Sequence, residues 1–161
     1  MLRDKNLVPL SRQHQHALAL CVRIERTAPI SDNDLSAWQA EIRQHFRAEI
    51  RIHFAAEEQF VFPSAHEFGE LGPLVNELLS DHAWLRERFA KAEGKSLSGT
   101  EIIEFARRLS EHIRKEERQL FERLQQLLSD EELAVMGQKV ALALQEAEQA
   151  CVVPAKSPRA T

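Results

Sequence analysis

Hydrophobic positions recur at steps of three and four residues along almost the whole chain. Residues three and four apart lie on the same side of an α-helix, so this spacing is typical of amphipathic helices. Glycine and proline are few and fall between the periodic segments. No segment has the strict alternation of apolar and polar residues that a half-buried strand requires. The pattern therefore predicts an all-α protein.

The breaks in this rhythm divide the chain into four long helices and a shorter fifth one. They fall at Thr27-Ala28-Pro29, at Pro63 with the loop 64–73, at the loop 94–99 and just before Ser129. Pro63 is expected to end or kink the second helix, and Thr100 to cap the fourth. Four long helices with short connections predict an up-down-up-down four-helix bundle, with the short C-terminal helix covering one side or end. We expect residues 1–150 to form this single domain and residues 151–161 to be a flexible tail.

Six polar side chains fall on stripes that are otherwise apolar. They are His14, His53, Glu57, His82, His112 and Glu116. Their order is a half-repeat, because a lone histidine on one helix is followed by His-x-x-x-Glu on the next, and both features then recur. A buried polar group without a partner costs about 1–3 kcal/mol, and an unpaired carboxylate costs more. A metal ion, or a pair of them, would satisfy all six groups, and nitrogen and carboxylate ligands without thiolate suit iron, manganese or zinc.

The first helix carries two histidines, and the pattern favours one of them as a ligand. His14 lies on the apolar stripe with Leu10 and Cys21. His16 lies about 200° around the helix from His14, on the polar side, where we expect it to be exposed. A shifted register would exchange the two histidines, so the first-helix ligand is His14 with His16 as the alternative.

Other acids and histidines near the six residues have more than one interpretation. Glu58 and Glu117 each follow a candidate ligand by one residue and are expected at the helix surface or as hydrogen-bonding partners of ligands. Either of them would become a ligand if the metal lay off-centre. His45 and Glu49 are expected at solvated or boundary positions, with hydrogen bonding to a ligand imidazole as the alternative.

Composition narrows the class of protein. The 161 residues suit one domain with a core of its own, and the net charge of −4 gives no sign of a nucleic-acid or anionic-membrane surface. The two cysteines, Cys21 and Cys151, form no CxxC motif and predict a reducing compartment. No apolar run is long enough to span a bilayer, so we expect a cytoplasmic protein. The absence of tyrosine excludes a tyrosine ligand or radical, and no HExxH motif supports a zinc protease.

One stretch of ten residues occurs twice. His53-Phe54-x-x-Glu57-Glu58-x-x-Val61-Phe62 is matched by His112-Ile113-x-x-Glu116-Glu117-x-x-Leu120-Phe121. With the lone histidines before each copy, the order resembles the hemerythrin-like, or HHE cation-binding, domain over roughly Leu10 to Leu128. The resemblance implies a non-haem di-iron centre with two iron ions bridged by two glutamates. By their donor chemistry, the same ligands would accept zinc or manganese as substitutes. The implied bridges are Glu57 and Glu116, and the implied terminal ligands are His14, His53, His82 and His112.

The chain departs from the oxygen-carrying hemerythrins on its third helix. Those proteins have a second histidine one turn away there, whereas the positions four residues from His82 are Leu78 and Arg86. Four histidines in place of five would leave a further coordination position open. This departure argues against simple reversible oxygen carriage and favours other exogenous ligands, among them nitric oxide and peroxide.

We therefore expect a di-iron protein that binds O₂, NO or peroxide for sensing, for oxygen or iron handling, or for protection against stress. We expect a binding protein, because the sequence identifies no general acid or base beyond the ligands. A di-iron enzyme that reduces peroxide or NO is one alternative. A zinc-bound or metal-free helical interaction module is another. The expected partner is a small gaseous or peroxide ligand, not a nucleic acid or a membrane, and the expected state is a monomer or a homodimer.

Overall fold

A computed structural model describes the backbone of residues 2–152 and the side-chain surroundings of residues 2–145. Within these residues every regular element is helical, and no strand is present. The elements are α1 (Val8–Thr27), α2 (Leu35–His45), η1 (Phe46–Ile50), α3 (Arg51–Ala56), η2 (Glu57–Val61), α4 (Phe62–His66), η3 (Gly69–Leu71), α5 (Gly72–Glu93), α6 (Gly99–Lys115), η4 (Glu116–Leu120), α7 (Phe121–Leu127) and α8 (Asp130–Val152). The all-α class is confirmed.

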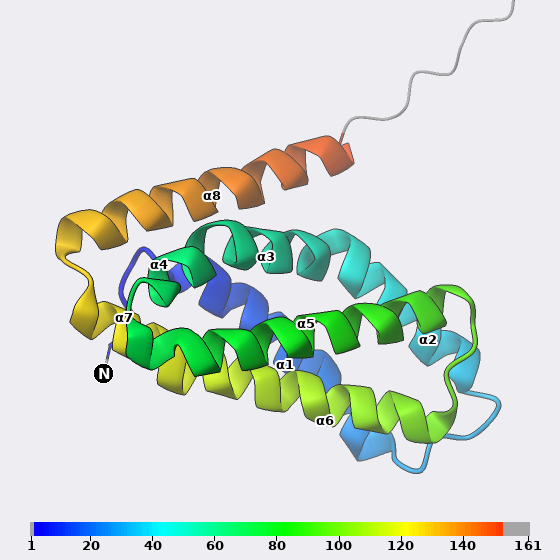
Figure 1. The fold of residues 1–161 in the computed structure, drawn as a ribbon. Coiled ribbons are helices and arrows are strands. Elements are labelled where there is room, and N and C mark those ends of the chain that lie inside the picture. Colours follow the sequence, from blue (N-terminus) through cyan, green and yellow to red (C-terminus); the bar gives the residue numbers. More distant parts are fainter. Residues whose placement is uncertain (1, 153–161) are drawn as a thin grey trace, which may run out of the picture.

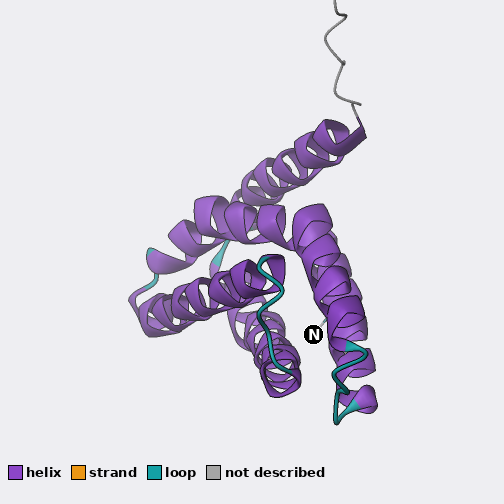
Figure 2. Ribbon diagram, turned by 90° about the vertical axis from the view of Figure 1, so that its right-hand side faces the viewer, coloured by secondary structure: helices purple, strands orange, loops and turns teal. Residues whose placement is uncertain are grey.

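These elements join into four long helical segments and a fifth helix, and together they form a helical bundle (Figure 1). The first segment is α1 and the third is α5. The second runs without interruption from α2 to α4, and the fourth from α6 to α7. Three π-helical turns, η1, η2 and η4, lie inside the second and fourth segments. In the bundle, α1 packs against α6 and α2 packs against α5. Figure 2 views the same bundle from the side and shows loops only between helices.

Two helix boundaries differ from expectation. Ser98, not Thr100, caps α6, and it forms a capping box in which its side chain accepts from the Glu101 N–H while Glu101 accepts from the Ser98 N–H. Pro63 does not end the second segment, because it lies at the start of α4 directly after the π-helical turn η2, and the chain is helical on both sides of it. The chain stays helical for three further residues, to His66.

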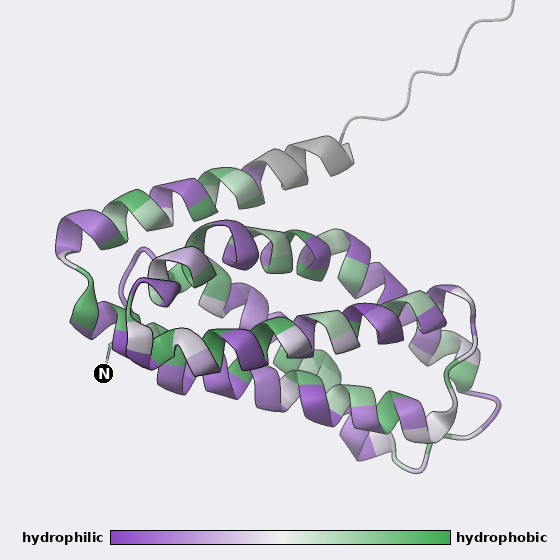
Figure 3. Ribbon diagram, in the orientation of Figure 1, coloured by the Kyte–Doolittle hydropathy of each residue, from purple (hydrophilic) through white to green (hydrophobic). Residues whose placement is uncertain are grey.

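The apolar core consists of two clusters separated by a polar layer. Along α1, Leu10 belongs to the first cluster and Ala17 to the second, with His14 between them. Along α5, Leu78 and Leu85 flank His82 in the same way. In Figure 3, hydrophilic and hydrophobic residues alternate along the helices. The six polar residues on the apolar stripes therefore lie in one layer across the middle of the bundle.

The fifth helix is longer than the short helix that the sequence pattern predicts. It has 23 residues and packs along α3 and η2 on the outside of the bundle (Figure 1). Among its side chains up to residue 145, the buried ones are Leu133, Met136, Val140 and Leu144. The helix includes Cys151 and Val152, which the predicted tail contained, and residues 153–161 of that tail lie outside the described residues. Within residues 2–152, no helix combines the length and the apolar character that crossing a membrane requires.

Candidate metal centre

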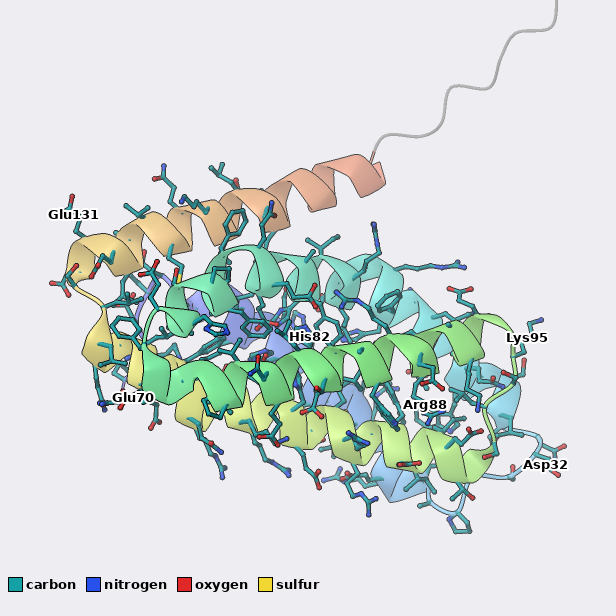
Figure 4. All side chains as sticks on the ribbon, in the orientation of Figure 1. Asp32, Glu70, His82, Arg88, Lys95 and Glu131 are labelled. Atoms are coloured by element: carbon teal, nitrogen blue, oxygen red, sulfur yellow. The ribbon has the colours of Figure 1, made fainter. Side chains whose placement is uncertain are left out.

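The structure brings all six candidate residues together in the polar layer. Each long segment contributes a histidine, and η2 and η4 each begin with a glutamate. The six side chains, His14, His53, Glu57, His82, His112 and Glu116, are all buried, with at most 4% of any residue exposed. Figure 4 labels His82 on α5, where its ring points into the bundle. His16, by contrast, has a side chain that is 61% exposed, so only His14 represents the first segment in this cluster.

The donor atoms form two groups that share the glutamates. The first group, called the first half of the site, contains His14 and His53, whose Nε2 atoms lie 2.9 Å apart. Glu57 Oε1 lies 3.1 Å from His53 Nε2, and Glu116 Oε2 lies 3.1 Å from His14 Nε2. Within this half, one donor atom from each of the four residues lies within 4.8 Å of the others.

The second group, called the second half of the site, contains His82 and His112 and the other carboxylate oxygen of each glutamate. The Nε2 atoms of His82 and His112 lie 3.1 Å apart. Glu57 Oε2 lies 3.4 Å from His82 Nε2, and Glu116 Oε1 lies 3.1 Å from His112 Nε2. Each carboxylate therefore faces the first half with one oxygen and the second half with the other, which is the arrangement that a bridging ligand needs.

Both glutamates open a π-helical turn, at matching places in the half-repeat. Glu57 begins η2 and Glu116 begins η4. A π turn holds one residue more than an α turn and occurs frequently at functional sites. Here each π turn begins at the glutamate of a His-x-x-x-Glu pair, so the regular α spacing that pairs His53 with Glu57 changes at the glutamate. The apolar periodicity of the sequence did not indicate these turns.

The residues fit a pair of metal ions. All four carboxylate oxygens of Glu57 and Glu116 are buried and accept no hydrogen bond from any described residue. Such groups carry a large desolvation cost unless something satisfies them. Four imidazole Nε2 atoms and four carboxylate oxygens around one layer are a donor set for iron, manganese or zinc, with no thiolate among them.

The two lone histidines, His14 and His82, each form a hydrogen bond on the side of the ring that faces away from the site. Their partners are the glutamates that directly follow Glu57 and Glu116 in the sequence. His14 Nδ1–H donates to Glu117 Oε1 over 2.7 Å, and His82 Nδ1–H donates to Glu58 Oε1 over 2.8 Å. A hydrogen bond at Nδ1 fixes the tautomer and directs the Nε2 lone pair inward. Of the positions considered for Glu58 and Glu117, the structure shows the one in which they hydrogen-bond to the candidate ligand imidazoles. Neither belongs to the inner donor groups.

The other two histidines face residues that the sequence pattern did not single out. His53 Nδ1–H donates to Gln13 Oε1 over 2.9 Å. His112 Nδ1 lies 3.6 Å from Asp81 Oδ2, which is an ion-pair contact but too long for a hydrogen bond. Gln13 and Asp81 directly precede His14 and His82, so the half-repeat itself contained the signal that could have found them.

Among the described residues, neither His45 nor Glu49 forms a hydrogen bond with one of the four candidate ligand histidines. The Glu49 carboxylate pairs with the exposed His16, whose Nδ1 lies 3.0 Å away. His45 Nε2 is buried and has no hydrogen-bond partner among the described residues. Glu49 nevertheless lines a small cavity beside the first half, as described below.

Protons compensate the charges of this cluster when no metal is bound. Burial by itself lowers the pKa of His14, but Glu116 and Glu117 raise it to about 9. Burial likewise opposes the charged form of His112, but Glu116 and Asp81 raise its pKa to about 10. The pKa of Glu116 falls well below its usual range because His112 and His14 outweigh the opposing effect of burial. Metal and protons would therefore compete for the same groups.

A small cavity of about 10 Å³ borders the first half, with room for about one water-sized molecule. Its lining includes His14, His53, Glu116 and also His112 from the site, together with Gln13 and Glu49. The apolar lining residues are Ala17, Ile50, Phe54, Leu109 and Ile113. The site therefore has a narrow, mostly apolar space on one side.

Comparison with known families identifies one match. The family model described as Hemerythrin HHE cation binding domain matches residues 8–124, which is well over half of the chain. That span contains all six residues of the inner cluster. No curated protein and no solved structure matches the chain.

Proposed function

The chain belongs to the hemerythrin HHE cation-binding domain family, and from this premise we propose that it holds two iron ions in the polar layer. His14 and His53 would hold one ion and His82 and His112 the other, with Glu57 and Glu116 bridging them. The observation that carries the proposal is the set of four buried carboxylate oxygens without hydrogen-bond donors. Zinc or manganese would fit the same donors. Family membership itself implies cation binding, and the number and identity of the ions are part of the proposal.

We further propose that the site takes up O₂, NO or peroxide on the side of the first half. The support is the small cavity beside His14 and His53, which has room for about one water-sized molecule. Its apolar residues, such as Ile50 and Leu109, keep bulk water away from the site. Iron, when bound, would supply a reversible change of oxidation state and a coordination position for such a ligand. The outward hydrogen bonds to Gln13 and Glu117 keep the two imidazoles of this half oriented.

The role that fits these features is sensing, oxygen or iron handling, or protection against stress, as a binding protein. Among the cavity residues outside the inner cluster, only Gln13 and Glu49 are polar, and the Glu49 carboxylate is engaged by His16. A general acid or base for turnover is thus not supplied by a free side chain there. We propose a cytoplasmic monomer or homodimer with no nucleic-acid partner, in which residues 1–150 form the domain and the four long segments run alternately up and down.

The test is metal loading followed by spectroscopy. The full chain is loaded with Fe(II) under anaerobic conditions, and elemental analysis is expected to approach two irons per chain. The optical spectrum of the reduced protein is expected to change on exposure to air or NO. A plateau at one iron would contradict the paired site. Two zinc ions with no optical response after purification from cells would support the zinc-bound alternative.

A further inference from the structure

The groups behind the four histidines form a ring around the bundle. In chain order, each long segment supplies one group to the histidine of the next segment, and the fourth supplies the first. The pairs are Gln13 with His53, Glu58 with His82, Asp81 with His112, and Glu117 with His14. The ring follows the half-repeat, so Gln13 and Asp81 occupy equivalent places, as do Glu58 and Glu117.

The ring is chemically uneven at one place. Three of its members are carboxylates, whereas Gln13 is a neutral amide. The second half therefore has a carboxylate facing each of its histidines, hydrogen-bonded to His82 and 3.6 Å from Nδ1 of His112. The first half has one carboxylate, Glu117, and one amide. A carboxylate that faces Nδ1 makes an imidazole a more basic ligand than a neutral acceptor does, and such partners affect metal affinity by roughly 10–100-fold.

Each carboxylate of the ring is paired with at least one cation. Arg3 pairs with Glu117 and Arg86 pairs with Glu58. Asp81 contacts both Arg108 and Lys115, which hold its carboxylate in place beside His112. Since every carboxylate of the ring has its own cationic partner, the contrast that remains between the halves lies in the acceptors themselves.

The two halves also differ in how they are enclosed. His82 is fully buried, the ring of Phe54 stacks on it with centroids 3.7 Å apart, and Phe62 lies 5.3 Å away. The small cavity touches His14 and His53 of the first half and also His112 of the second half, but it does not touch His82. An apolar shell limits access of water and competing ligands to a metal. Enclosure is therefore tightest at His82, and together with the acceptor charges it favours the second half.

We propose that the two halves fill in a fixed order, with the first ion bound between His82 and His112, and that Gln13 is the positioning residue that keeps the other half weaker. The protein then has a defined one-metal form, and the metal beside the cavity is the exchangeable one. This inference rests on the proposed two-metal site.

The order can be read from the histidines themselves. Metal-free full-length protein with ¹⁵N-labelled histidine is titrated with Zn(II), a diamagnetic probe, and the Nε2 resonances are assigned with single His→Asn variants. Up to one equivalent, we expect the resonances of His82 and His112 to shift while those of His14 and His53 stay in place. The latter two should shift only between one and two equivalents. Parallel shifts of all four, or earlier shifts of His14 and His53, would overturn the order but leave the proposed function standing. Zinc uptake that moves none of the four would overturn both.

Exchanging the two equivalent residues of the ring tests the part assigned to Gln13. In Gln13→Glu, the ratio of the two stepwise dissociation constants should shrink by roughly 10-fold or more. Asp81→Asn should also reduce this ratio, because it weakens metal binding in the second half. The double variant Gln13→Glu, Asp81→Asn should reverse the order of filling. Gln15→Glu is the matched control, because it adds the same charge to an exposed position on the same helix. A ratio in Gln13→Glu equal to that of the control, with both proteins folded, would show that Gln13 does not set the difference.

Discussion

His14 donates from Nδ1 to Oε1 of Glu117 over 2.7 Å, while the Nε2 atom of the same ring faces Glu116 Oε2 at 3.1 Å. Two consecutive glutamates thus contact opposite edges of one imidazole from a neighbouring helix. His82 has the same relationship to Glu58 and Glu57, at 2.8 and 3.4 Å. The doubled glutamate of each ten-residue repeat therefore combines an inner donor with an outer support.

Replacement of an inner glutamate should destroy the two-metal site. Glu57→Gln or Glu116→Gln removes a carboxylate that faces both halves, and a neutral amide cannot supply its charge. We expect iron content after Fe(II) loading to fall below one ion per chain or to stop at one, as measured by elemental analysis. Glu111→Gln, at an exposed position of α6, is the control and should load like the unaltered protein. Full loading of the Glu57 or Glu116 variant would show that these carboxylates do not bridge.

Replacement of an outer glutamate should weaken the site without abolishing it. Glu58→Gln and Glu117→Gln keep a hydrogen-bond acceptor for Nδ1 but remove its charge, so we expect metal affinity to fall by roughly 10–100-fold. The stoichiometry at saturating metal should stay unchanged. Competition with a chelator of known affinity measures the change. Loss of stoichiometry in these two variants would place them among the inner ligands instead.

The metal-free protein should lose stability as the pH rises above neutrality. The pKa values of His14 and His112, raised from 6.5 to about 9 and about 10, mean that protonation stabilises the fold fully below pH 6.5. That contribution is lost as the pH rises through 9 to 10. The pKa values of Glu58 and Glu117, lowered from 4.5 to about 2, give a contribution that is present above pH 4.5 and lost toward pH 2. Thermal unfolding followed by circular dichroism should therefore give a maximum Tm between pH 4.5 and 6.5.

The loss of thermal stability on metal removal should increase with pH, because the metal-free protein becomes less stable while the metal binds more strongly. Ligands must be deprotonated to bind, so bound metal replaces the protons of the cluster most easily at higher pH. The difference in Tm between the loaded and the chelated protein should grow from pH 6 to pH 9. Native-state binding at a hundredfold excess over Kd contributes about 2.7 kcal/mol. A Tm that is insensitive to chelation at every pH would mean that the buried cluster holds no metal.

Gly137 is a test of how α8 is attached. A Cβ atom at this position would lie 2.4 Å from Cβ of Asn6, so Gly137→Ala must push α8 away from the N-terminal segment. Alanine normally favours a helix by about 1 kcal/mol, but we expect this contact to dominate and to lower the free energy of unfolding by about 1–3 kcal/mol. Gly69→Ala, where no atom lies within 4 Å, should change it by no more than about 0.5 kcal/mol. Urea denaturation compares the two variants, and equal stabilities would show that α8 tolerates the shift.

Helical periodicity alone selected the six residues that meet in the polar layer. The face of a helix on which a residue lies depends only on its spacing from its neighbours, so a histidine on an apolar stripe points to the core wherever that helix packs. For this reason the sequence sufficed for the all-α class and for the preference of His14 over His16. It also indicated the pairing of His53 with Glu57, which involves a single turn of one helix.

The contacts between residues of different helices could not be predicted from the sequence and were found only in the tertiary structure. Which residue of one segment reaches the outer edge of a histidine on the next depends on how the two helices are rotated and offset, and local spacing carries no such information. The roles of Gln13 and Asp81, and the choice between surface and imidazole partner for Glu58 and Glu117, were therefore decided only by packing. The π turns at Glu57 and Glu116 and the full length of α8 belong to the same class, because packing against other segments, and not local propensity, determines them.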